Sequence, residues 1–142
     1  MAAPYNSKRI VVLDNSAAIA ILMADEKDSE YAQTLLQKLD QIRFIVPALW
    51  RYEFANTIRM IQKRNRIVES KLVQLFADME ALQIEVVEDV QSPSVLREIS
   101  QAHDVTAYDA AYLELALRRN VAIATCDRQL KAAAIAANIE II

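Results

Sequence analysis

Four acidic side chains, Asp14, Glu53, Asp109 and Asp127, lie at or near the expected starts of helices. If the fold brings them together, their oxygen atoms form a ligand set of the kind that Mg²⁺ or Mn²⁺ prefers in proteins. Each residue also has a simpler explanation. Asp14 and Asp127 are suitable helix N-caps, Asp109 completes a variant capping box begun by Thr106, and Glu53 suits a solvated helix surface. Their joint position therefore decides whether they do chemistry.

The elements that must position these acids alternate between short apolar runs and amphipathic segments. Strands are predicted at 8–13, 43–46, 84–87, 121–125 and 139–142. Helices are predicted over the run AAIAILMA (17–24), over 28–40, from Pro47 to about 64, and over 68–82, 92–101, 106–119 and 127–137. This order predicts an α/β fold: a single domain over residues 1–142, with a mainly parallel five-stranded sheet flanked by helices on both faces.

A parallel sheet places the carboxyl ends of its strands and the amino ends of the following helices at one edge. Asp14 directly follows the first strand, and Asp127 follows the fourth strand within two residues. Asp109 lies in the first turn of its helix and Glu53 in the second turn of the helix that Pro47 begins. All four acids are therefore predicted at the same edge of the sheet.

The composition excludes several other kinds of site. The chain has no glycine, so it contains neither a Walker phosphate loop nor a G-x-G-x-x-G turn. Its single histidine, His103, excludes a two-histidine acid–base mechanism, and its single cysteine, Cys126, cannot form an internal disulfide. We expect Cys126 to be a small buried residue. Asn120 and Asn138 are expected to take the left-handed conformation at helix ends that glycine usually supplies.

Charge and hydropathy leave the partner class open. The net charge is −3, whereas nucleic-acid-binding domains usually carry a basic excess. Without the four acids, however, 16 basic and 15 acidic residues remain, a balance of +1. No apolar run is long enough to span a bilayer and no signal-peptide pattern is present, so we expect a cytoplasmic protein with no membrane association.

Three further groups of residues have two interpretations each. A basic cluster can contact an RNA backbone or cover a solvated helical hairpin; it comprises Arg59, Lys63, Arg64, Arg66 and Lys71. The aromatic residues Trp50, Tyr52 and Phe54 can stack on bases or pack in the core or a partner interface. Glu114 is five residues from Asp109, about 140° around the helix, and should point elsewhere.

Three segments of the chain resemble the PIN-domain family, and within it the VapC-like ribonuclease toxins of toxin-antitoxin systems. VVLDNSAAIA (11–20) is similar to the family's opening segment and LWRYEFANTI (49–58) to its internal glutamate helix. TAYDAAYLELALRRNVAIATCDRQLKAAA (106–134) is similar to its closing motif, in which two aspartates lie 18 residues apart. The closing segment is the most specific of the three. Asn120 departs from the family pattern, which commonly has glycine there.

The resemblance implies a function for each of these positions. Asp14, Glu53, Asp109 and Asp127 would be the catalytic acids around Mg²⁺ or Mn²⁺, with Asp14 and Asp109 as the principal ligands. Ser16, Thr125 and, more weakly, Asn56 would orient the carboxylates or water around them. The implied activity is a metal-dependent endoribonuclease that hydrolyses RNA phosphodiester bonds. The implied partners are an RNA substrate, a cognate antitoxin protein and a second copy of the chain in a homodimer.

Two other functions stay open at this point. A receiver-like signalling domain also has an acidic cluster with magnesium at strand ends, but it normally needs a lysine after its last strand. A PIN-type fold can also act as a catalytically silent interaction module. The last expected strand ends at Ile142 with no lysine after it, which argues against the receiver-like domain. The complete set of four acids argues against the silent module.

Overall fold

The computed structural model describes residues 4–23 and 28–142. Its strands are β1 (Arg9–Leu13), β2 (Ile42–Pro47), β3 (Glu85–Val87) and β4 (Ala122–Ala124). Its helices in the described ranges are the short 3-10 turn η1 (Tyr5–Ser7), α1 (Asn15–Met23), α2 (Ser29–Leu36), α3 (Trp50–Lys63), α4 (Glu69–Ala81), α5 (Pro93–His103), α6 (Ala107–Arg119) and α7 (Arg128–Ala136). The predicted run of α1 ended at Ala24, which lies outside the described residues.

The strands form one parallel sheet in the order β3-β2-β1-β4. The prediction of a parallel α/β sheet is confirmed, but the prediction of five strands is wrong, because the sheet has four. The predicted fifth strand, 139–142, makes only an isolated parallel bridge between Ile141 and Ile123. β4 is itself three residues long, so it offers little edge along which a further ladder could extend.

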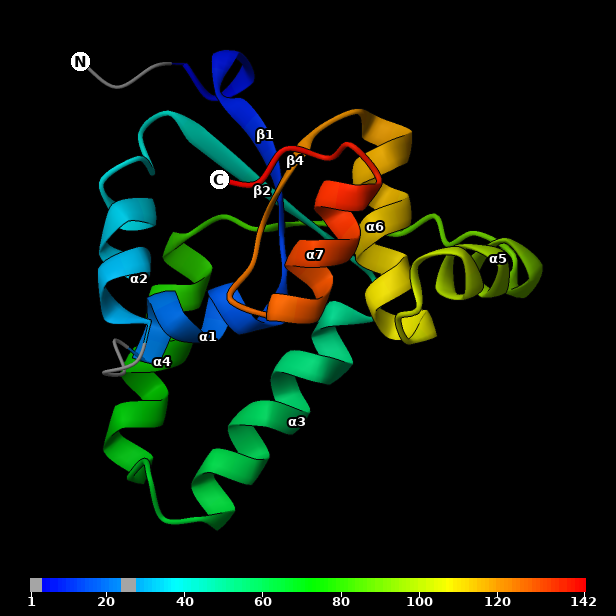
Figure 1. The fold of residues 1–142 in the computed structure, drawn as a ribbon. Coiled ribbons are helices and arrows are strands. Elements are labelled where there is room, and N and C mark those ends of the chain that lie inside the picture. The colour runs from blue at the N-terminus through cyan, green and yellow to red at the C-terminus, as the bar shows by residue number, and fades with distance from the viewer. Residues whose placement is uncertain (1–3, 24–27) are drawn as a thin grey trace.

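Helices cover both faces of this sheet, as predicted. In Figure 1, α1, α2 and α4 lie on one side of the strands, and α5 and α6 lie on the other. The cover explains why Val11, Val12 and Leu13 of β1 are all fully buried, although their side chains alternate between the two faces. α6 is enclosed in turn, because every residue from Ala110 to Ala116 is buried.

Helix ends are turned without glycine. Asn120 (φ 51°) and Asn138 (φ 58°) both have the predicted left-handed conformation, and so does Asn65 (φ 55°) between α3 and α4. Asparagine tolerates this region better than most residues because its short polar side chain can bond locally. These three turns set the directions in which β4, the C-terminal segment and α4 leave their helices.

α3 and α4 form a hairpin that projects from the body of the protein (Figure 1). Pro47 does not begin α3 as predicted: it ends β2, where it pairs with Val87, and the helix begins at Trp50. The terminal position in the strand tolerates the missing N–H of proline. Phe54 packs edge-on against Phe76 of α4 with ring centroids 6.1 Å apart, which fixes the base of the hairpin. In the described ranges, no helix is both long and apolar enough to cross a membrane.

Candidate active site

The site lies where β1 and β4 end side by side. Asp14 directly follows β1, and its backbone N–H donates to the carbonyl oxygen of Ala124 at the end of β4 over 3.0 Å. α1 and α7 begin within a few residues of these strand ends, at Asn15 and Arg128. The chain therefore puts two carboxylates, Asp14 and Asp127, at the same edge of the sheet.

The carboxylate of Asp14 is buried and held by three donors. Its Oδ2 accepts hydrogen bonds from Ser16 Oγ (2.6 Å) and Thr125 Oγ1 (2.7 Å), and its Oδ1 accepts one from the Asn15 backbone N–H (2.8 Å). Only 5% of the residue is exposed. Ser16 Oγ is itself fixed by the backbone N–H of Cys126 (3.0 Å). The two hydroxyls named from the sequence thus lie against Asp14 and hold its orientation.

Thr125 also links Asp14 to Asp127. The Asp127 backbone N–H donates to Thr125 Oγ1 over 3.0 Å, so one hydroxyl contacts both segments. Asp127 Oδ1 accepts from the Leu130 N–H (2.9 Å), which confirms its predicted role as the N-cap of α7. That bond uses one lone pair of the carboxylate and leaves its other oxygen for a further ligand.

Asp109 and Glu53 come from the helices opposite. Asp109 lies in the first turn of α6, where its N–H donates to Thr106 Oγ1 (3.1 Å), as a capping threonine requires. Among the described residues its carboxylate has no hydrogen-bond partner. Glu53 lies in the first turn of α3, and its Oε1 accepts a hydrogen bond from Tyr112 Oη (2.7 Å). Tyr112 is fully buried on α6, so this bond ties α3 to the helix that carries Asp109.

Sequence reasoning missed Tyr112 and a second link, between Asn15 and Thr57. Asn15 Nδ2 donates to Thr57 Oγ1 (3.0 Å), and Thr57 Oγ1 donates to the Glu53 carbonyl (2.8 Å). A signal was available for Tyr112, which lies three residues after Asp109 and thus near it on α6. Asn56, which the resemblance favoured instead of Thr57, is exposed on α3, and its role stays a prediction.

The pKa values show that the four carboxylates share one electrostatic environment. Burial raises the pKa of Asp14, and the charge of Asp127 adds to this rise. Burial raises the pKa of Glu53, and the charges of Asp14 and Asp109 contribute. Burial also raises the pKa of Asp109 to about 6, with contributions from Asp127 and Asp14. Without a cation, the negative charges of these acids therefore repel one another.

These residues fit a hard divalent cation that keeps part of its water shell. Within residues 4–23 and 28–142, no group of three or more acidic, histidine or cysteine side chains is arranged to hold a metal ion by itself. Magnesium commonly binds through one or two carboxylates with water and substrate phosphate completing its shell. The buried Oδ1 of Asn15, which has no hydrogen-bond partner in the described part of the chain, is available to accept from such a water. Burial raises the pKa of the Cys126 thiol to about 12, so it stays protonated and is a poor ligand.

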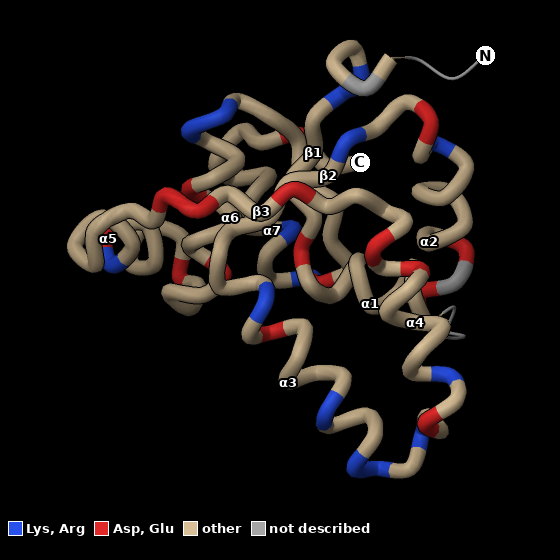
Figure 2. Tube along the Cα trace, turned by 180° about the vertical axis from the view of Figure 1, so that it is seen from behind, with Lys and Arg blue, Asp and Glu red and all other residues tan. Residues whose placement is uncertain are grey.

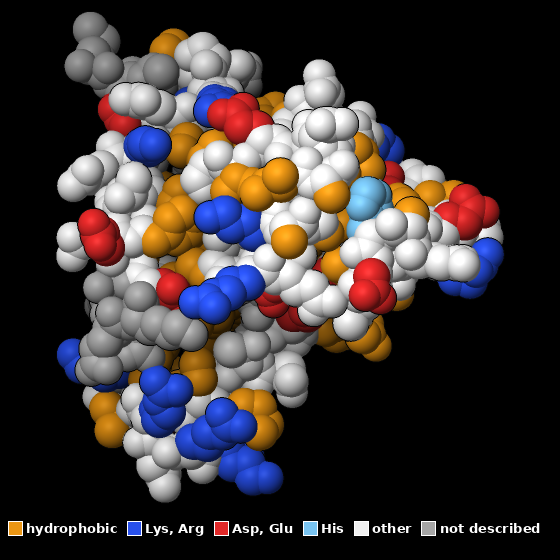
Figure 3. All heavy atoms as spheres, in the orientation of Figure 1, with side chains coloured by type: hydrophobic (Ala, Val, Ile, Leu, Met, Phe, Trp, Pro, Cys, Tyr) orange, Lys and Arg blue, Asp and Glu red, His pale blue; other side chains and the backbone are white. Residues whose placement is uncertain are grey.

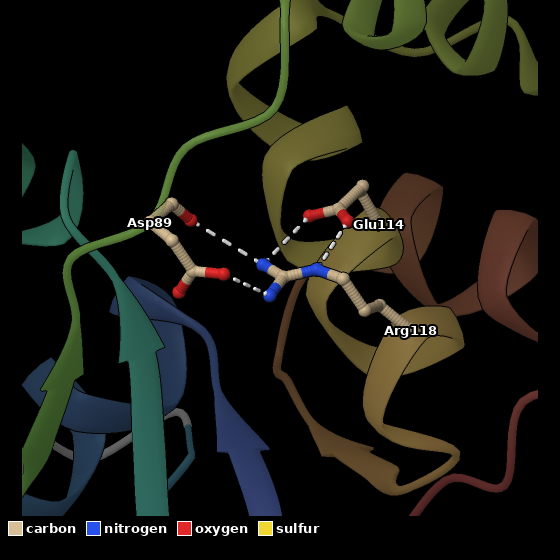
Figure 4. A network of polar contacts seen from close by, with 3 residues as sticks. All are labelled: Asp89, Glu114 and Arg118. Atoms are coloured by element: carbon tan, nitrogen blue, oxygen red, sulfur yellow. Dashed lines mark hydrogen bonds and ion pairs between the residues drawn. The ribbon is translucent and has the colours of Figure 1, made fainter.

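Glu114 belongs to a different network, as predicted. It is buried on α6 and pairs with Arg118, whose Nε lies 2.6 Å from Glu114 Oε1. Arg118 Nη1 also lies 2.6 Å from Asp89 Oδ2, in the segment after β3 (Figure 4). The buried acid is thus neutralised by an arginine that fastens α6 to the segment following β3.

We expect Thr125→Val to lower metal-dependent catalysis by about 10- to 100-fold, the usual cost of losing a residue that orients a metal ligand. Valine has nearly the same shape but removes the donor to Asp14 and the acceptor for the Asp127 N–H. The free energy of unfolding should fall by about 1 to 3 kcal/mol. Thr34→Val is the matched control, because Thr34 is exposed on α2 and its Oγ1 donates to the Glu30 carbonyl of the same helix. Equal activities for the two variants would contradict the role of Thr125.

Comparison with known proteins gives a family, a relative and a solved structure. The family model for the PIN domain matches residues 11–136. The chain is similar to Ribonuclease VapC3 of Pyrobaculum aerophilum, with 29% identity over 120 residues that cover 82% of this chain and 88% of the relative. Its fold is similar to that of PAE2754 from Pyrobaculum aerophilum, with a TM-score of 0.66 at 20% identity, over 89% of this chain and 80% of the other.

Proposed function

Because the chain belongs to the PIN-domain family, we propose that it is a metal-dependent endoribonuclease that hydrolyses phosphodiester bonds in RNA. The observation that carries this proposal is the hydrogen-bond network at one edge of the sheet, in which Thr125 joins Asp14 to Asp127 and Tyr112 holds Glu53 against α6, the helix of Asp109. Similarity to a protein named as a ribonuclease supports the choice of RNA over other phosphodiesters.

In the proposed mechanism, Asp14 and Asp109 are the principal ligands of Mg²⁺ or Mn²⁺, and Glu53 and Asp127 bind directly or through water. A bound cation would supply Lewis acidity, which would make a water molecule a better nucleophile and stabilise negative charge on the phosphate oxygens. Protein groups supply the positioning. Ser16 and Thr125 fix Asp14 Oδ2, whereas Tyr112 fixes Oε1 of Glu53 and leaves Oε2 open.

Two observations argue that the nucleophile is water rather than a side chain. The Cys126 thiol stays protonated because burial raises its pKa to about 12. The hydroxyls that contact Asp14, those of Ser16 and Thr125, both donate to its carboxylate and both accept a backbone N–H. Their protons already serve the positioning of a carboxylate. Hydrolysis by water is therefore the reaction that these groups support.

We further propose that the chain is the toxin of a toxin-antitoxin pair, that it acts on RNA in the cytoplasm, and that it forms a homodimer. Similarity to a VapC ribonuclease supports the toxin role. The α3–α4 hairpin also exposes large apolar side chains that an antitoxin or a second copy could cover: Met60, Val68, Val73 and Phe76.

The two alternative functions are less well supported. Family membership removes the receiver-like domain, since the PIN-domain model matches residues 11–136. A catalytically silent PIN module would not need four coupled carboxylates, because their repulsion costs stability and brings a purely structural protein no benefit.

The deciding experiment incubates the purified protein with total RNA in the presence of Mg²⁺, Mn²⁺ or EDTA. We expect RNA fragments with either metal and intact RNA with EDTA. Cutting in EDTA would contradict the metal-dependent mechanism. Intact RNA under all three conditions, for a protein that is folded by circular dichroism, would instead support the silent module.

A further inference from the structure

One side of α3 carries a row of exposed polar and aromatic residues. Tyr52, Asn56, Arg59 and Lys63 follow one another at spacings of four, three and four residues. At about 100° per residue, they fall within about 60° on the helix surface. All four side chains are exposed, and Tyr52 is the most exposed large hydrophobic side chain of the helix at 80%. We call these four residues the α3 row.

The α3 row begins beside the candidate active site. Tyr52 is the residue before Glu53, whose Oε1 is held by Tyr112. The opposite side of α3 is buried through Trp50, Phe54 and Ile58, so the row cannot be part of the core. From Glu53 to Lys63 the helix rises about 15 Å, which matches roughly four phosphates of a stacked strand at 3.4 Å each.

The charge of the protein is unevenly divided around this row. Residues 59–71 hold five of the sixteen basic residues and one of the nineteen acidic residues, so this segment carries +4 and the rest of the chain carries −7. Figure 2 shows Lys and Arg gathered along the far part of α3 and around the turn into α4. Figure 3 shows the same basic group at the projecting end of the molecule. Within the described residues, Arg59 and Lys63 form no ion pair.

The helix that carries the α3 row is held in place by packing against α4, so the row has a fixed position relative to the acids. Trp50 and Phe54 stack with ring centroids 5.0 Å apart, and Phe54 contacts Phe76 of α4. Ile58, Leu72 and Leu75 are buried along the same seam. An exposed tyrosine and two cations on a fixed helix offer stacking and charge at set distances from the acids.

We propose that the α3 row binds an unpaired segment of the RNA substrate beside the cleavage point. Tyr52 stacks on a base next to the scissile phosphate, Asn56 hydrogen-bonds the strand, and Arg59 and Lys63 bind the phosphates that follow. This inference rests on the proposed ribonuclease function. An unpaired strand is favoured because a base within a duplex has no free face for Tyr52. The α3 row also explains how a protein with net charge −3 holds a polyanion near an acidic site.

The test measures cleavage kinetics on a single-stranded RNA oligonucleotide for the double variant Arg59→Ala/Lys63→Ala. We expect KM to rise about tenfold while kcat stays within twofold of wild type, because these residues bind substrate but lie away from the reacting atoms. A plot of log(kcat/KM) against log salt concentration should become shallower by about 1.4, since each lost phosphate contact contributes about 0.7. The matched control is Lys38→Ala/Arg119→Ala, which removes the same charge from exposed positions on other elements. We expect this control to keep the wild-type KM and salt dependence.

A second variant tests stacking separately. Tyr52→Ala should raise KM about tenfold, and Tyr52→Phe should restore it, because stacking needs the ring and not the hydroxyl. If the wild-type protein cleaves RNA and the row variants behave like the Lys38/Arg119 control, the inference is wrong. The proposed ribonuclease function is then unaffected. Row variants that lose only the binding of a protein partner, with unchanged RNA kinetics, would overturn it as well. Absence of cleavage by the wild-type protein would instead overturn the proposed function.

Discussion

Asp109→Asn is expected to lower RNA cleavage by at least about 1000-fold and to make the metal-free protein more stable at pH 7.5. Cleavage falls because the amide cannot replace a carboxylate as a principal metal ligand. Stability rises because burial disfavours the charge of Asp109, Asp127 and Asp14 repel it, and its carboxylate has no hydrogen-bond partner in the described structure. Its interaction with the amino end of α6 is favourable and offsets part of this gain. We therefore expect a net increase of about 1 kcal/mol in the free energy of unfolding.

The gain in stability from Asp109→Asn should depend on pH. The folded protein raises the pKa of Asp109 from 3.8 to about 6, so it binds this proton more tightly than the unfolded chain does. The metal-free wild type should therefore lose stability as pH rises from about 4 to about 6. Urea denaturation in EDTA should show the advantage of Asp109→Asn at pH 7.5 and its disappearance at pH 4.

Asp104→Asn is the matched control for charge, because Asp104 is exposed and lies just before α6. Its left-handed conformation (φ 50°) suits asparagine equally well. We expect wild-type cleavage from this variant. Similar stability changes in both variants would show that the gain reflects net charge alone and not the crowding of the four acids.

The positions of Asp14 and Asp127 could be predicted because they depend on local signals. Each follows a short buried strand, and a parallel sheet must bring such strand ends to one edge. The caps at Thr106 and Asp127 and the left-handed turns at Asn120 and Asn138 are equally local, and the structure confirms all four.

Contacts between distant elements could not be predicted in this way. The bond from Tyr112 to Glu53 joins residues 59 positions apart, and its existence depends on how α3 leans against α6. The bond from Asn15 to Thr57 depends in the same way on the packing of α1 against α3. The spacing of hydrophobic residues in these helices does not specify the angle at which two helices pack. The prediction of a fifth strand failed for a related reason. The apolar run at 139–142 indicates contact with the core but does not show whether the segment pairs with a neighbouring strand.

The acidic and the basic residues lie on different parts of the protein, as the proposed binding of a cation and of RNA requires. In the proposed function the acids bind a cation, and among the described residues none of the four forms an ion pair with a lysine or an arginine. The basic residues proposed to bind RNA lie instead on the projecting hairpin, and among the described residues none of them pairs with Glu53. A single mixed cluster would neutralise itself and bind neither ligand well.

Asp14→Asn should abolish cleavage, by at least about 1000-fold, while the metal-free protein keeps its free energy of unfolding within about 1 kcal/mol or gains stability. The new amide fits the same place. Its oxygen can accept from the Asn15 N–H, while its nitrogen can donate to the hydroxyl oxygens of Ser16 and Thr125. Each of these oxygens already accepts one backbone N–H and has a second lone pair for the amide. The variant also removes a buried charge that burial itself disfavours.

Asp14→Ala separates the chemical role of this residue from its structural one. Alanine provides no acceptor, so the Asn15 N–H and the two hydroxyls lose their partner in a site that is almost closed to water. We expect a loss of about 2 to 4 kcal/mol in urea denaturation with EDTA. Both variants should be inactive, but only the alanine variant should be unstable. If Asp14→Asn is as unstable as Asp14→Ala, the carboxylate serves mainly to join β1, α1 and β4. If Asp14→Asn still cuts RNA, Asp14 is not a metal ligand.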